Sequence, residues 1–228
     1  MKNTIIIAAA LIIAGAMLPF SVAKFKSYDR TVDVRGLCER EVKADKVIWP
    51  LTYKVVGNEL GDVLKDTDRY NNYILSFLKN GGIEDSEITV AAAQISDKFA
   101  NEYGNNDRVY RYLCTNVITV CTSNVDAVLS LRSRQDEILK QGIALSENWE
   151  NRTEFKFEAL NDIKPEMIAE ATASAREAAQ KFAKDSNSKL GKIKNASQGV
   201  FSIEDRDSNT PELKKVRVVT SVTYYLNR

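Results

Sequence analysis

The sequence predicts an α+β fold, with a mixed, mostly antiparallel sheet and about three helices packed on it. Segments with alternating apolar residues follow one another largely in pairs, which is typical of neighbouring antiparallel strands. Three segments with helical spacing are interspersed among them, a pattern that argues against a doubly wound parallel sheet. No linker rich in Pro, Gly or Ser divides the chain after residue 30, so we expect a single domain over residues 31–228.

The first two expected strands are Thr31–Cys38 and Val47–Val56, and both carry alternating apolar residues. Pro50 lies on the less apolar face of the second strand. It suggests an edge position or a bulge, because proline has no N–H for a strand ladder. The charged stretch Glu39–Lys46 lies between the two strands, and we expect them to pair as a hairpin across it.

A helix is expected between Leu60 and Leu78, where apolar residues recur at helical spacing until an Asn-Gly-Gly sequence at residues 80–82 ends the pattern. The chain then returns to strands. The expected ones are Ile88–Ile95 and, after a polar turn, the long strand Val109–Thr122. The long strand has apolar residues on both faces, and three helices cannot easily cover both, so we expect some apolar surface to be left for another subunit. The alternative is a monomer in which loops cover the second face.

A second helix is expected to begin near Asn124 and to end at Gly142, and the short strand Glu154–Glu158 follows it. Its expected buried residues are Val125, Val128, Leu129 and Leu139.

The third expected helix has the clearest pattern, and Pro165 fits its first turn. A stripe of mostly small residues runs along it, which would let the helix lie close to the sheet. The stripe consists of Ile168, Ala171, Ala175, Ala179 and Phe182. Short strand pieces at Lys192–Ala196 and Val200–Ile203 and a long alternating strand at Lys214–Leu226 complete the expected elements.

The N-terminal segment Thr4–Ala23 has no charged residue and is long enough to enter a membrane. Pro19 and the small residues of Ser21-Val22-Ala23 favour a cleaved signal peptide over residues 1–23. The alternative is a retained anchor, which the positive charges at and after Lys24 disfavour. In either case we expect export, with residues 24–30 as a short lead-in.

The composition excludes several classes of function. The chain has no histidine, so it cannot build a Ser-His-Asp or Cys-His site or a histidine-based metalloprotease motif. Lys and Arg total 32 against 31 acids, and removing residues 1–23, which hold only Lys2, leaves 31 against 31. Because phosphate neutralisation needs a basic excess or stripe, we expect no nucleic-acid partner.

The three cysteines, Cys38, Cys114 and Cys121, do not form a metal-binding pattern. Cys114 and Cys121 lie on one expected strand roughly 23 Å apart, whereas a disulfide tolerates about 7 Å between Cα atoms. Cys38 could meet either one. The favoured interpretation is that the cysteines are small buried hydrophobic residues.

Three short motifs are interpreted as chance or as surface features. Ser-x-x-Lys, the spacing of an acylation dyad, occurs at Ser21, Ser76 and Ser186 without any companion motif. Asp205-x-Asp207-x-Asn209 opens like a calcium loop but has Thr210 and Val216 where glycine and glutamate are needed. Scattered acids are expected to be solvated; they are Glu84, Asp85, Glu87, Glu147, Glu150 and Glu154. We therefore expect no catalytic, cofactor-binding or metal-binding residue.

A set of short segments recurs in a characteristic order along the chain: Val32–Gly36, Ala44-Asp45, Gly82-Ile83, Glu87–Thr89, Tyr110–Tyr112, Asn116–Val120, Gln141–Ile143, the alanine-rich run from Glu170 to Ala183, and Leu190–Ile193. This ordered set resembles the SIMPL domain family of exported bacterial envelope proteins. The resemblance runs from about residue 30 to the C-terminus. The three cysteines are a departure from what we would expect of the family.

The resemblance implies a periplasmic protein, or one anchored in the inner membrane and facing the periplasm, that tends to self-assemble and is linked to envelope integrity or stress. It implies no catalytic residue. The leading hypothesis is a non-enzymatic module that binds itself or another envelope component and meets the membrane only through residues 4–23, if these are uncleaved. The alternative is a small-molecule or peptide binder with a pocket between the alanine-rich helix and the sheet.

Overall fold

The computed structural model describes Gly15 and residues 30–100, 109–147 and 149–227. Apart from Gly15, the expected export segment therefore lies outside the described residues. Within the described ranges the chain forms four α-helices and two mostly antiparallel sheets, which confirms the predicted α+β class. No helix among these residues is both long enough and apolar enough to span a bilayer.

The chain divides into two compact units that alternate along the sequence. Unit 1 contains the residues up to Glu41, Leu160–Glu204 and Lys215–Arg228. Unit 2 contains Val42–Ala159 and Asp205–Lys214. Among the described residues, unit 2 has a sheet with three α-helices and unit 1 a sheet with one. The expectation of a single domain over residues 31–228 stays a prediction.

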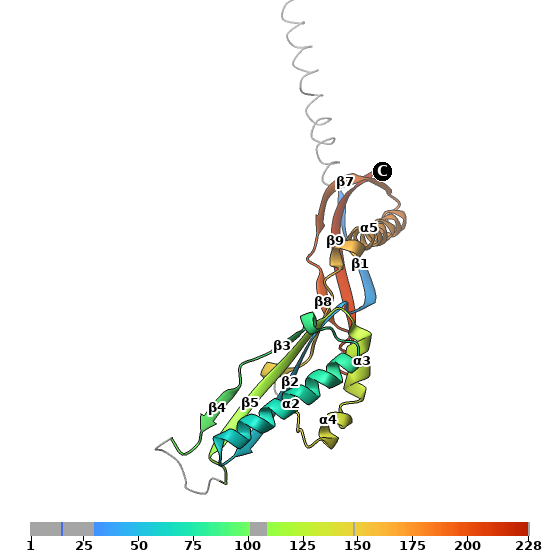
Figure 1. Ribbon diagram of the computed structural model, residues 1–228. Helices are drawn as coiled ribbons and strands as arrows, with labels where there is room; N and C mark the ends of the chain where they lie inside the picture. Colours follow the sequence, from blue (N-terminus) through green and yellow to red (C-terminus); the bar gives the residue numbers. More distant parts are fainter. Residues whose placement is uncertain (1–14, 16–29, 101–108, 148, 228) are drawn as a thin grey trace, which may run out of the picture. The chain divides into compact units, whose positions relative to one another are not determined.

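The sheet of unit 2 is built around two long central strands, β2 and β5, which pair antiparallel along their length. The strand order is β3-β5-β2-β6, and β4 also pairs with β5 (Figure 1). The strands are β2 (Lys46–Gly57), β3 (Ile88–Val90), β4 (Gln94–Asp97), β5 (Tyr112–Thr122) and β6 (Glu154–Lys156). The expected strand at residues 88–95 is thus two short strands.

Helices cover one face of this sheet, and the main hydrophobic core lies between them (Figure 1). They are α2 (Leu60–Asn80), α3 (Val125–Ser133) and α4 (Asp136–Lys140), together with the 3-10 turns Asp85–Glu87 and Trp149–Asn151. The largest buried side chains include Trp49, Leu51, Tyr53, Ile74 and Ile118. Alternation along β2 and β5 places these strands' core residues on the helix-covered face.

The predicted buried face of the second helix is only partly correct. The expected helix is two helices, α3 and α4, and Asn124 caps the first as expected. Val125 and Val128 are buried, but Leu139 is exposed because α4 starts a new helical phase after a break at Arg134–Gln135.

The expected hairpin between the first two strands is wrong. The first strand, β1 (Thr31–Lys43), is longer than predicted and belongs to the sheet of unit 1, whereas β2 pairs with β5 and β6. Each strand has one apolar face, but β1 turns Val34 and Cys38 into the core of unit 1 while β2 turns Trp49 into that of unit 2. Alternation alone does not specify which sheet a strand joins.

The sheet of unit 1 has the order β1-β9-β7, and β8 also pairs with β9. The strands are β7 (Lys189–Gln198), β8 (Ser202–Asp205) and β9 (Leu213–Asn227). β7 and β9 pair antiparallel with irregularities between Leu190 and Asn195. The helix α5 (Leu160–Asp185) packs its alanines against Val34, Val222 and Tyr224.

The predicted stripe of α5 is correct at its centre and wrong at its ends. Ala171, Ala175 and Ala179 are fully buried, as expected. Met167 replaces Ile168 as the buried residue at one end, Ala183 is buried near the other, and Phe182 is 59% exposed. The actual stripe repeats every four residues. The helix also begins at Leu160, so Pro165 lies beyond its first turn.

Candidate functional site

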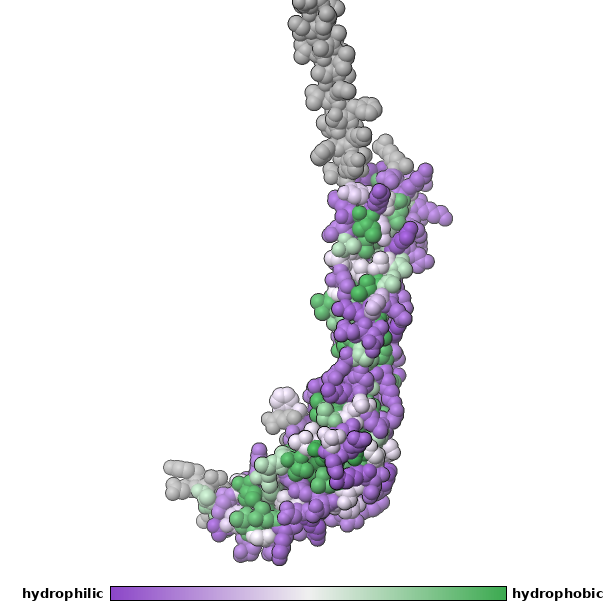
Figure 2. Space-filling model, turned by 45° about the horizontal axis from the view of Figure 1, so that its top comes forward, coloured by the Kyte–Doolittle hydropathy of each residue, from purple (hydrophilic) through white to green (hydrophobic). Residues whose placement is uncertain are grey.

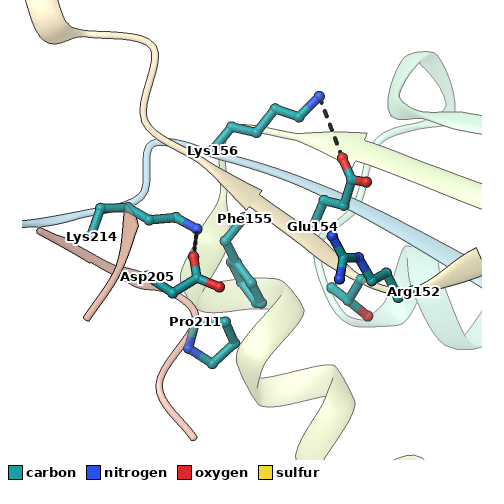
Figure 3. A pocket seen from close by; sticks show the side chains of 8 residues that line it. Arg152, Glu154, Phe155, Lys156, Asp205, Pro211 and Lys214 are labelled. Atoms are coloured by element: carbon teal, nitrogen blue, oxygen red, sulfur yellow. Dashed lines mark hydrogen bonds and ion pairs between the residues drawn. The ribbon is translucent and has the colours of Figure 1, made fainter. Parts of the chain in front are cut away.

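A pocket of about 390 Å³ opens in unit 2 between β6 and the segment that returns from β8 to β9. Figure 3 shows its lining side chains. They are Arg152, Thr153, Glu154, Phe155, Lys156, Asp205, Pro211 and Lys214. Strand β6 supplies its residues because its pairing with β2 turns Phe155 into the core and leaves Glu154 and Lys156 on the other face.

The charges around this pocket largely neutralise one another. Lys214 is buried and forms an ion pair with Asp205, and Lys156 lies 3.5 Å from Glu154 (Figure 3). The hydroxyl oxygen of Thr153 is buried without a hydrogen-bond partner. The buried cation Lys214 already has its anion, and none of the pocket's side chains forms a nucleophile–base pair.

The segment Asp205–Asn209, whose sequence begins like a calcium-binding loop, is stabilised by hydrogen bonds within the loop. The carboxylate of Asp207 accepts hydrogen bonds from the backbone N–H groups of Asn209 and Thr210, at 2.8 and 2.9 Å. Hydrogen bonds from the side chains of Thr210 and then Arg206 hold the pKa of Asp207 far below its usual range. Asp205 pairs with Lys214, so the three residues do not converge on one point. No group of three metal-binding side chains occurs among the described residues.

The serines of the Ser-x-x-Lys motifs make local bonds rather than dyads. The hydroxyl of Ser76 donates to the Asn72 carbonyl oxygen, while Lys79 pairs with Asp85 at 2.6 Å. Ser186 donates to the Ala183 carbonyl oxygen at the end of α5. The third motif, at Ser21, lies outside the described residues.

The acids singled out in the sequence have structural partners. Glu84 and Glu87 form a capping box around the turn at residues 85–87, and Glu87 also accepts a hydrogen bond from Thr122. Glu147 lies 3.9 Å from Arg132. Such contacts fix turns and do not pair two carboxylates for acid–base chemistry. Nothing is described of the Glu150 side chain.

Cys38 belongs to an ionic cluster that joins β1 to α5 within unit 1. Its thiol donates a hydrogen bond to Glu170 at 2.9 Å, and Arg40 bridges Glu170 and Glu166 at 2.7 and 2.8 Å. Burial, and then the bond to Glu170, raises the pKa of Cys38 to about 11. The thiol therefore stays protonated near neutral pH and is a poor nucleophile.

The other two cysteines are also free, and both lie on β5. Cys114 is buried against α2, whereas Cys121 lies on the opposite face of the sheet and is exposed. The expectation that all three cysteines are buried is therefore wrong for Cys121.

A buried polar network in unit 2 was missed by the sequence analysis. The side-chain N–H of Asn116 and the hydroxyl of Tyr53 both lie 2.8 Å from the side-chain oxygen of Asn71. Burial raises the pKa of Tyr53 to about 12, so its hydroxyl cannot act as a base at neutral pH. The one available signal was an asparagine in the middle of an apolar strand. The network fastens α2 to the sheet.

The alanine-rich helix leaves no room for a ligand where it crosses Gly36 on β1. A Cβ atom placed on Gly36 would lie 1.8 Å from the Ala171 carbonyl oxygen and 2.4 Å from the Ala175 nitrogen. Backbone therefore touches backbone there, and the expected pocket between this helix and the sheet is absent at that crossing.

The outer edge formed by β3 and β4 is the candidate interaction site. Both strands pair with β5, and no described strand pairs with their other side (Figure 1). Seven consecutive residues, Thr89–Ile95, are exposed and uncharged. Val90 and Ile95 are 44% and 42% exposed. Uncharged, proline-free edges of this kind are templates for pairing with another strand.

Comparison with protein-family models decides the family. The SIMPL model, described as a protein of unknown function (DUF541), matches residues 32–224. The chain belongs to the SIMPL family. The match spans both compact units, so it includes the sheet of unit 2 with its exposed edge and the alanine-rich helix of unit 1. No curated protein matches the chain.

Membership confirms the resemblance found in the sequence and brings no assigned activity with it. The SIMPL domain of this chain therefore has to be interpreted from its own surfaces. Figure 2 shows a mostly hydrophilic exterior on which apolar residues surface in patches. The exposed edge of unit 2 differs from an ordinary scattered exposure because its residues are consecutive and their backbone is unpaired on one side.

Proposed function

We propose that this SIMPL protein is an exported, non-enzymatic module of the bacterial envelope that acts by self-assembly or by binding another envelope component. One observation carries the proposal: the exposed, uncharged run Thr89–Ile95 on an open edge of the unit 2 sheet. Free N–H and C=O groups along such an edge are satisfied equally well by a strand of another chain, which provides affinity without any catalytic group.

The candidate reactive side chains make structural hydrogen bonds, which supports a binding role over an enzymatic one. Ser76, Glu87 and Cys38 are each engaged in a hydrogen bond that holds local structure. The proposed location is the periplasm, or the periplasmic side of the inner membrane if residues 4–23 are retained, and the proposed role concerns envelope integrity or stress. The alternative is a small-molecule or peptide binder, for which the pocket lined by Phe155 and Lys214 is the candidate site.

The solution mass of the purified chain tests the proposal. We expect light scattering at micromolar concentration and physiological salt to report at least twice the chain's mass, because an open edge gains backbone hydrogen bonds by pairing. The measurement uses the protein as a bacterial host exports it, with and without detergent to allow for a retained anchor. A monomer under all these conditions would contradict self-assembly and favour the ligand-binding alternative.

A further inference from the structure

The backbone of β3 and β4 shows which residues face the open side of the edge. The N–H of Ala91 donates to the Val117 carbonyl oxygen, and that of Lys98 donates to the Arg111 carbonyl oxygen, so both point inward to β5. Because successive residues of a strand turn their N–H and C=O groups to opposite sides, Val90 and Ile95 turn theirs outward. These two residues are therefore the hydrogen-bonding positions of the free edge.

The side chains of Val90 and Ile95 lie on the same face, although they are five residues apart. Val90 pairs with Ile118, whereas Gln94 pairs with Thr115, so the edge contains one residue more than β5 over this span. Such a bulge reverses the alternation. Val90, opposite Ile118, and Ile95, opposite Cys114, consequently both lie on the helix-covered face of the sheet.

This arrangement is complementary to itself. If two edges run antiparallel with the centre between Ala92 and Ala93, Val90 of one copy lies opposite Ile95 of the other, and the two bulges meet. Two outward-facing residues then form a hydrogen-bonded pair, with both apolar side chains on one face. The same register places Glu87, whose carboxylate also accepts hydrogen bonds from Thr122 and from the Glu84 N–H, opposite Lys98 of the other copy. Side chains of opposite charge thus lie across from each other at both ends of the pair.

The other sheet edges do not offer the same surface. β7 carries Lys189, Lys192 and Lys194 and pairs irregularly with β9, which are two ways of protecting an edge from association. β6 is short and places Glu154 and Lys156 on one face. The long edge strand β1 carries Asp33, Arg35 and Glu39, and β8 carries Glu204 and Asp205, whereas the edge formed by β3 and β4 has no charged residue over residues 88–96.

We propose that two copies of this chain pair antiparallel through residues 88–97, with β3 of each copy bonded to β4 of the other. This inference rests on the proposed function, because it names the partner and the surface of the same self-association. It predicts a two-fold symmetric contact that continues the unit 2 sheet from one copy into the next.

Cysteine cross-linking tests the register. In a Cys121→Ser background, which removes the exposed thiol, Val90→Cys and Ile95→Cys are made as separate, differently tagged chains. Co-expressed and oxidised, the two chains should form a disulfide-linked dimer, because Cα atoms in a hydrogen-bonded pair are about 5.5 Å apart. Each variant alone should stay uncross-linked, since like positions would be roughly 16 Å apart.

A charge at the centre of the edge provides an independent test in the uncross-linked chain. Ala92→Lys brings two like charges together across the symmetry axis and should raise the dimer dissociation constant at least about tenfold. Ala173→Lys, the same exchange at an exposed position of α5, should leave the mass unchanged. Circular dichroism melting of both variants confirms that neither result comes from unfolding.

The outcomes separate the two proposals. A wild-type dimer or larger assembly without the mixed disulfide, or one unaffected by Ala92→Lys, would overturn the edge pairing and leave self-assembly standing through another surface. A disulfide formed by either single variant alone would overturn the register. A monomeric wild-type chain would overturn the edge pairing together with the self-assembly on which it rests.

Discussion

At the residue scale, the packing of unit 1 depends on the absence of a side chain at Gly36. The helix α5 crosses β1 there at backbone contact distance, which the small side chains of Ala171 and Ala175 permit. A helix this close to a sheet buries its small residues completely and leaves no cavity between them. The absence of a side chain at Gly36 therefore explains why the alanines of α5 serve for close packing against β1.

Gly36→Ala should lower the free energy of unfolding by about 1–3 kcal/mol, because its Cβ would overlap backbone atoms that cannot rotate away. Urea unfolding followed by circular dichroism measures the change. Gly61→Ala is the matched control: a Cβ there meets nothing within 4 Å, and alanine in helix α2 should raise stability by roughly 0.5 kcal/mol. Equal stability of the Gly36 variant and the wild type would show that α5 can shift without cost.

At the element scale, the positions of strands and helices along the chain were well predicted, but the pairing between strands was not. β9, α2 and the start of α3 lie close to where alternation, helical spacing and a capping residue placed them. The pairing of β1 with β2 failed because two consecutive amphipathic strands can each bury their apolar face against a different helix layer. Pro50 fits an edge position, since β6 pairs only with Lys46–Ile48 and stops short of it.

Asn124 is the clearest local signal for an element boundary, and its contribution can be measured. Its side-chain oxygen accepts a hydrogen bond from the Ala127 N–H at 3.1 Å, satisfying a group at the start of α3 that has no partner within the helix. Asn124→Ala should cost about 1 kcal/mol of unfolding free energy, whereas Asn124→Asp, which keeps the acceptor, should cost a few tenths. Urea unfolding midpoints check both values, and an alanine variant as stable as the aspartate variant would contradict the role of the cap.

For the candidate site too, features that depend on nearby residues could be predicted, whereas those that depend on strand pairing could not. The calcium loop was rejected on the residues at two of its positions and the Ser-x-x-Lys motifs on their repetition and missing companion motifs, and the structure gives Asp207 and Ser76 local partners. A strand at residues 88–95 was expected, but its position at an edge was not. Exposure of a strand depends on which strands pair beside it, and that is settled by residues far away in sequence.

At the scale of the whole molecule, the proposed export would place any association outside the cytoplasm. A periplasm-dependent reporter fused after Arg228 should be active in a bacterial host if, as we propose, the uncharged segment Thr4–Ala23 directs the chain across the membrane. An inactive reporter from a stably expressed fusion would contradict export. N-terminal sequencing separates the two forms: a start at Lys24 indicates cleavage, and retained Met1 indicates an anchor.

The sequence by itself determined the class of the fold, the approximate extent of most elements and the absence of histidine chemistry, since these depend on composition and on periodicities within one segment. Only the tertiary structure decided that the strands divide between two sheets, that Gly36 brings α5 onto β1, and that Thr89–Ile95 forms an open edge. The physical reason is that partner choice between strands is a competition among long-range contacts. A local pattern shows that a face must be buried but does not name what buries it.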